Sequence, residues 1–91
     1  MPLNTEELIT SRALTHGTFG YNADTFEAFM QILEPRLLIG HPTYVRFALR
    51  MILVKMSRIL HGDPRFLDHW KDIAGYTRLV EEIIQQENER E

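Results

Sequence analysis

Apolar residues recur at three- and four-residue steps through the centre of the chain, which is the period of an amphipathic α-helix. The first such run predicts a helix over residues 23–33, with Phe26, Phe29, Met30 and Leu33 on one face. Pro35 is expected to end it, because the residue before a proline avoids the helical region. Arg36 to His41 then reads as a connector.

The next run predicts a helix over residues 42–61 with two apolar seams. The broad seam, expected to face the core, comprises Val45, Ala48, Leu49, Ile52, Leu53, Met56, Ile59 and Leu60. The second seam comprises Phe47, Met51 and Val54. A helix with two apolar seams must bury both, so the second seam predicts a homodimer or a higher homo-oligomer.

A last helix is predicted over residues 64–86. Its expected core stripe is Phe66, Trp70, Ile73, Val80 and Ile84, and Asp68, Asp72, Gly75 and Leu79 follow the edge of that stripe. Glycine inside a helix costs about 1 kcal/mol relative to alanine. Gly75 therefore predicts the close approach of another helix or of a ligand.

The N-terminal quarter looks different. A short helix over residues 5–14 has few apolar residues, and residues 15–22, with two glycines and no helical period, read as a loop. The prediction is one all-α domain over residues 1–91, a small bundle of three to four helices. Residues 1–22 form an accessory helix and loop, 23–86 the helical core with a C-terminal antiparallel hairpin, and 87–91 a frayed tail.

The turn of that hairpin is His61-Gly62-Asp63-Pro64. A glycine just past a helix end adopts the left-handed conformation cheaply, and an aspartate followed by proline suits the start of the next helix. A hairpin centred here places Arg58 level with Asp68 and Lys55 level with Asp72. Two basic and two acidic side chains therefore share one seam.

Two interpretations of that seam stay open. Half-buried charges need partners, and in the first interpretation the four groups form salt bridges that hold the hairpin in register. Alternatively they form a pocket in which Lys55 and Arg58 bind phosphate or carboxylate groups. Asp68 and Asp72 would then contact hydroxyl groups, a base edge or one magnesium ion, since they lie one helical turn apart.

Two further residues are candidate ligand contacts. His16 is flanked by a glycine and lies near Phe19 and Asn22 in the sequence, a setting that suits a nucleobase or a phosphate. The alternative is a loop that only packs Phe19 and Tyr21 onto the bundle. Tyr76 lies near the acidic edge and is expected to line a pocket. No serine–histidine–acid set and no phosphate-cradling glycine loop is present.

Composition narrows the functional classes. The net charge of −3 gives no electrostatic support for binding nucleic acid, and the absence of cysteine excludes disulfides and thiolate metal sites. Arg46, Arg50, Lys55 and Arg58 interrupt the longest apolar stretches, so no membrane span is expected. The polar, acidic start of the chain is unlike a signal peptide. A cytoplasmic protein, in a host cytoplasm if viral, is the expectation.

Three stretches together resemble a family of small phage and prophage proteins of unassigned function. They are Thr15-His16-Gly17-x-Phe19-x-x-Asn22, then Met51-x-x-x-Lys55-x-x-Arg58-Ile59-Leu60-x-Gly62, then Asp68-His69-Trp70-x-Asp72-Ile73-Ala74-Gly75-Tyr76. That family is distantly similar to the all-helical MazG-like nucleotide pyrophosphohydrolases, in which acidic motifs on two adjacent helices hold magnesium against a nucleotide. The stretch with Asp68 and Asp72 looks like the second of those acidic motifs.

The first acidic motif is missing. Where the pyrophosphohydrolases carry glutamates on the preceding helix, this chain has Lys55 and Arg58. Bases in place of acids remove a metal cage but keep affinity for phosphate. The resemblance with this departure implies a non-catalytic protein that captures a nucleotide or nucleotide-derived immune signal, without a required cofactor. A magnesium-dependent pyrophosphohydrolase and a protein-interaction module that inhibits a host factor are the alternatives.

Overall fold

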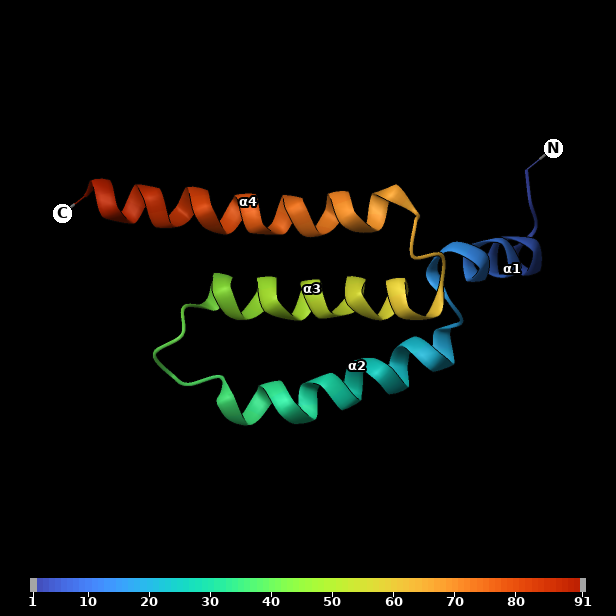
Figure 1. The fold of residues 1–91 in the computed structure, drawn as a ribbon, viewed down its shortest axis with the longest axis horizontal. Helices are drawn as coiled ribbons and strands as arrows, with labels where there is room; N and C mark the ends of the chain where they lie inside the picture. Colours follow the sequence, from blue (N-terminus) through green and yellow to red (C-terminus); the bar gives the residue numbers. More distant parts are fainter. Residues whose placement is uncertain (1, 91) are drawn as a thin grey trace.

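The computed structural model describes residues 2–90 and confirms an all-α fold, with no strand in that range. The elements are α1 Thr5–His16, α2 Phe19–Leu33, a 3-10 turn Glu34–Arg36, α3 Thr43–His61 and α4 Leu67–Glu89. The three long helices lie side by side in one layer with α3 in the middle (Figure 1). The shorter α1 projects from one end of that layer, next to the turn between α3 and α4.

The predicted loop over residues 15–22 is wrong, because helix continues on both sides and only Gly17 and Thr18 separate α1 from α2. Gly17 has φ +80°, a backbone conformation that side chains other than glycine disfavour, and this one residue redirects the chain. Asn22, the last residue of the predicted loop, lies inside α2. Its side-chain amide donates hydrogen bonds to the carbonyls of His16 and Thr18, at 2.7 and 3.0 Å.

The hairpin of α3 and α4 is present as predicted, but its turn differs in detail. Gly62 has φ −110°, which is not left-handed. The turn requires glycine for another reason, because a Cβ here would overlap the Thr15 carbonyl of the neighbouring segment. Asp63 accepts a hydrogen bond from the Arg65 backbone at 2.9 Å and so caps a short turn, and α4 begins later than predicted. Helix α4 also extends to Glu89, so residues 87–89 of the predicted tail are helical, whereas Glu91 lies outside the described residues.

The structure differs most from the sequence-based prediction in its hydrophobic core. Of the apolar side chains in residues 2–90, only Ala48 is buried. Trp70, expected in the core, is 52% exposed, and its indole N–H donates to the Pro64 carbonyl at 2.8 Å. The buried residue of α4 is instead His69, at 1% exposure. Among residues 2–90, nothing outside its own helix backbone lies within 4 Å of where a Cβ on Gly75 would be, so no other helix of this chain approaches there. The approach of a ligand at Gly75 stays a prediction.

None of the helices in residues 2–90 combines the length and the apolar character that a membrane crossing requires.

Candidate functional site

Lys55 and Asp72 form an ion pair between α3 and α4, at the level that the hairpin predicts. The Lys55 ammonium lies 2.8 Å from Oδ2 of Asp72. The lysine is buried, whereas the Asp72 side chain is about half exposed at 47%. The hydrogen bond from Lys55 lowers the pKa of the Asp72 carboxyl. This pair has the geometry expected of a salt bridge that holds the hairpin in register.

The other residues predicted to meet along this seam do not come together. Arg58 and Asp68 form no ion pair within residues 2–90, and Asp68 is exposed. Tyr76 is half-buried on α4. No three His, Asp or Glu side chains of the described chain gather as a metal site. A magnesium ion on Asp68 and Asp72 would therefore have two carboxylates, one of which Lys55 already engages.

A cavity of about 630 Å³ lies where α1, α2 and α3 meet. Its walls are Ile9, Thr10, Arg12, Ala13, His16, Gly17, Thr18, Phe19, Asn22, Ala23, Phe26, Val54, Ser57 and Arg58. A volume of this size is in the range of small-molecule sites, which are mostly apolar with a few convergent polar groups. It brings two of the predicted contacts, His16 and Arg58, to one site; Lys55, Asp68, Asp72 and Tyr76 are outside its lining.

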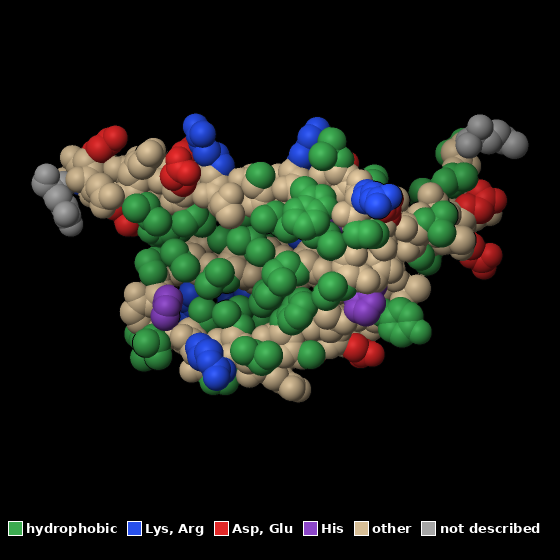
Figure 2. Space-filling view, in the orientation of Figure 1, with side chains coloured by type: hydrophobic (Ala, Val, Ile, Leu, Met, Phe, Trp, Pro, Cys, Tyr) green, Lys and Arg blue, Asp and Glu red, His purple; other side chains and the backbone are tan. Residues whose placement is uncertain are grey.

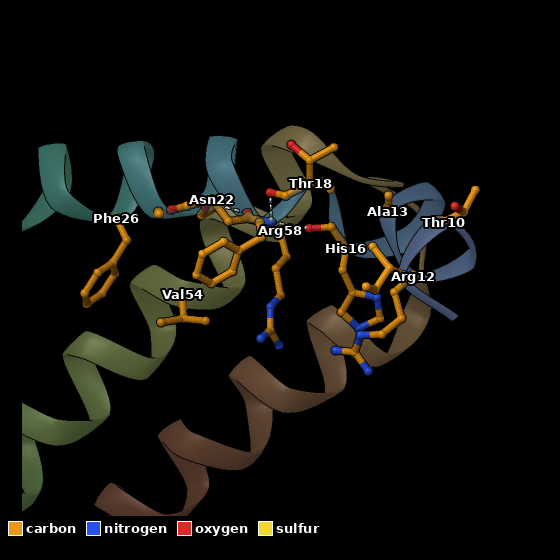
Figure 3. A pocket seen from close by; sticks show the side chains of 14 residues that line it. Thr10, Arg12, Ala13, His16, Thr18, Asn22, Phe26, Val54 and Arg58 are labelled. Carbon is orange, nitrogen blue, oxygen red and sulfur yellow. Dashed lines mark hydrogen bonds between the residues drawn. The ribbon is translucent and has the colours of Figure 1, made fainter. Parts of the chain in front are cut away.

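One end of the cavity is positively charged. Figure 3 shows Arg12 and His16 side by side on α1, with the guanidinium of Arg58 from α3 next to them. Neither arginine has a carboxylate partner among residues 2–90. The pKa of His16 is lowered, first by burial and then by the charges of Arg12, His69 and Arg58. The direction of this shift agrees with the positive charge that Figure 3 shows around His16.

The other end of the cavity is apolar, with Phe26 of α2 and Val54 of α3 (Figure 3). Phe19, at the start of α2, is also among the lining residues, but its side chain is 90% exposed, so Phe26 is the aromatic ring enclosed at this end. Aromatic faces of this kind stack on planar rings. The cavity is thus divided into a cationic end and an aromatic end.

Partly buried hydrogen bonds link the three helices that form the cavity wall. Ser57, which is 1% exposed, donates to Oδ1 of Asn22 at 2.6 Å. The amide of Asn22 in turn donates to the His16 carbonyl at the end of α1. One chain of polar contacts therefore fixes α1, α2 and α3 relative to each other, which sets the position of the His16 ring.

The His16 ring is also packed from the side of α4. It lies 4.8 Å from the ring of His69 in an edge-on arrangement and 5.4 Å from the ring of Phe66. Aromatic pairs at such distances are mutually stabilising. Packing therefore fixes the position of the His16 side chain, which lies in a helix and not in a loop.

The sequence alone did not single out Arg12, Ser57 or Phe26 as site residues. The signal for Arg12 was present, because it precedes His16 by four residues and so shares a helix face with it. It was overlooked because the predicted helix stopped at Leu14, which left His16 in a loop. Ser57 gave no such signal, since a serine among basic residues on a polar face is unremarkable until its partner Asn22 is placed.

Comparisons of this chain with protein-family models, with curated proteins and with solved structures give no match.

Proposed function

We propose that the cavity between α1, α2 and α3 binds a nucleotide or a nucleotide-derived signal and holds it without cleavage. The observation that carries this proposal is the pair of guanidinium groups, Arg12 and Arg58, which meet His16 at one end of a mostly apolar cavity. A ligand with a phosphate at one end and a flat ring at the other complements both ends.

In this arrangement the phosphate lies against Arg12 and Arg58. Guanidinium groups donate paired hydrogen bonds to phosphate oxygens, and such charge-assisted bonds are about twice as strong as neutral ones. His16 adds a third donor, and a bound anion favours its protonated form. The base lies against Phe26, where stacking contributes about 1–3 kcal/mol per base.

Capture without cleavage is supported by the residue types of the lining. The cavity wall contains no Asp or Glu. Phosphate-ester cleavage with magnesium needs carboxylates that hold the metal next to the phosphate. Asp68 and Asp72, which the sequence resemblance likens to a metal motif, are not among the lining residues. We therefore assign to Arg12 the phosphate contact that the sequence analysis assigned to Lys55, which does not line the cavity.

The test is titration calorimetry of the purified protein with ADP, with a cyclic dinucleotide and with adenosine, each with and without magnesium. Binding of a phosphorylated probe but not of adenosine is expected, together with recovery of the intact probe. Arg58→Gln is expected to weaken that binding by about 10- to 100-fold, the loss of one charge-assisted hydrogen bond of about 1.5–3 kcal/mol.

Arg78→Gln is the matched control. Arg78 is exposed on α4 and pairs only with Glu82 one turn away, so its removal leaves binding unchanged. An equal loss of affinity in both variants would mean that binding depends only on the net charge of the protein, and it would contradict the cavity site. Cleavage of the probe that depends on magnesium would instead support the alternative, a pyrophosphohydrolase. No heat with any phosphorylated probe would overturn the proposal in favour of a protein-interaction module.

A further inference from the structure

The helical layer has an apolar face that the chain itself does not cover. On α3, Leu49, Met56 and Leu60 recur at steps of seven and four residues, which places them on one stripe, and they are 36%, 41% and 64% exposed. Neighbouring helices add further exposed apolar side chains, Ile32 on α2 and Trp70 and Ile84 on α4. Figure 2 shows hydrophobic side chains in a continuous band across α2, α3 and α4, with most charges at its edges.

The surface area of the chain shows how much of a core is missing. The accessible surface is 7117 Å² for a mass of 10.7 kDa. A folded monomer of that mass is expected to expose about 5500 Å². The excess of about 1600 Å² per chain exceeds the roughly 800 Å² per partner of an ordinary interface and matches obligate homodimers.

The shape agrees with the area. The radius of gyration is 16.1 Å, whereas a compact chain of 91 residues is expected near 12 Å. A single layer of helices, 54 Å long and 21 Å thick, explains the difference. Stable domains instead pack two layers around one hydrophobic core.

We propose that a second copy of this chain covers the α2–α3–α4 face, so that two single layers form one two-layer helical bundle with a shared core. Because this chain needs the second layer in order to fold, the molecule that provides that layer must be available whenever the chain is synthesised. A second copy of the same chain always meets that condition. Few charges interrupt the band in Figure 2, so apolar burial drives the pairing, as in obligate homodimers.

This dimer differs from the one predicted from sequence. The second seam of α3 was expected to form the contact, but Val54 of that seam lines the cavity. Phe47 of the second seam is also exposed, at 58%, but the stripe of Leu49, Met56 and Leu60, expected to be the core of a monomer, belongs to the apolar band that extends onto α2 and α4 (Figure 2). It becomes the core of the dimer. This inference does not depend on the ligand proposed above.

Sedimentation equilibrium of the wild-type protein tests the inference without any variant. A mass of twice 10.7 kDa, or an even multiple of it, is expected. The midpoint of thermal unfolding is also expected to rise with protein concentration, because folding and association are coupled. A folded species of 10.7 kDa at the highest concentration reached, or an odd number of chains, would overturn the proposal.

Met56→Glu locates the contact. A buried, unpaired carboxylate in the centre of the face is expected to raise the dimer dissociation constant by at least about 100-fold. Ile39→Glu makes the same kind of change at a residue that is 99% exposed in the segment between α2 and α3, and it leaves the mass unchanged. Dimers that persist in Met56→Glu, or that dissociate equally in Ile39→Glu, would place the contact elsewhere and overturn the inference.

Discussion

Nε2 of His69 lies 2.6 Å from the carbonyl oxygen of Thr15, and the histidine is almost fully buried at 1% exposure. Because a carbonyl oxygen only accepts hydrogen bonds, Nε2 carries the hydrogen. The same oxygen accepts a second hydrogen bond from the Asp63 backbone at 3.0 Å. One peptide group at the end of α1 thus joins the α3–α4 turn to α4, and this junction positions the neighbouring His16 beside the cavity.

We expect His69→Ala to lower the free energy of unfolding by about 2–3 kcal/mol, from the lost hydrogen bond and the void left by the ring. Urea unfolding at a fixed protein concentration measures the change. Lys71→Ala, an exposed residue on the same helix, is the control and is expected to stay within about 0.5 kcal/mol of wild type. A similar loss in both variants would argue against a specific role of the junction.

Glycine is required at residue 62 by close approach. A Cβ on Gly62 would overlap the Thr15 carbonyl, so Gly62→Ala is expected to destabilise the protein by about 1–3 kcal/mol through forced backbone shifts. Gly75→Ala is the matched opposite, since it lies in a helix with no neighbour near its Cβ position, and it is expected to stabilise by about 0.5–1 kcal/mol. Thermal unfolding of the two variants should therefore shift in opposite directions; a shift of the same sign would refute this account.

The ion pair of Lys55 and Asp72 predicts unequal effects of removing its two partners. Asp72→Ala leaves a buried ammonium without its carboxylate, whereas Lys55→Met removes the buried charge and keeps an apolar stem. Asp72→Ala is therefore expected to be the more destabilising variant at neutral pH, in urea unfolding. If Lys55→Met proves the more harmful, the lysine has a role beyond this pair.

The same pair sets a pH dependence. The pKa of Asp72 is lowered from its ordinary 3.8 by the Lys55 hydrogen bond, so the unfolded chain takes up the proton first as pH falls. The stability from this pair is complete above pH 3.8 and is lost as pH falls through the lowered pKa. Lys55→Met should remove that part of the acid dependence when unfolding free energies are compared across the range.

His16 affects stability at a higher pH. Burial and neighbouring charges lower its pKa from 6.5, so the folded protein resists its protonation while the unfolded chain accepts it. Folding stability should fall as pH drops below 6.5 and level off beneath the lowered pKa. His16→Gln is expected to flatten this part of the curve, measured by urea unfolding between about pH 7.5 and about 5. An unchanged curve would show that His16 protonates equally in both states.

Part of the candidate site could be predicted from the sequence. The spacing of Lys55 and Asp72 about the turn at Gly62 was enough to place them level, because an antiparallel hairpin leaves little freedom of register. Arg58 and His16, predicted as ligand contacts, both line the cavity, and their contact with a ligand stays a prediction. Their partner Arg12 was missed, since helix ends are set by contacts such as the one between Thr15 and His69, which lie 54 residues apart.

The sequence by itself determined the local structure: the helical period, the stops at Pro35 and Gly62, and the pairing of α3 with α4 through a short turn. Only the tertiary structure decided which stripes are covered. Periodicity shows that a helix has an apolar face but does not name the neighbour that buries it, so Trp70 and Leu49 are exposed where the pattern predicted a core, and His69 is buried instead. The cavity has the same origin, because it exists only where three separately predicted helices meet at angles that no local pattern records.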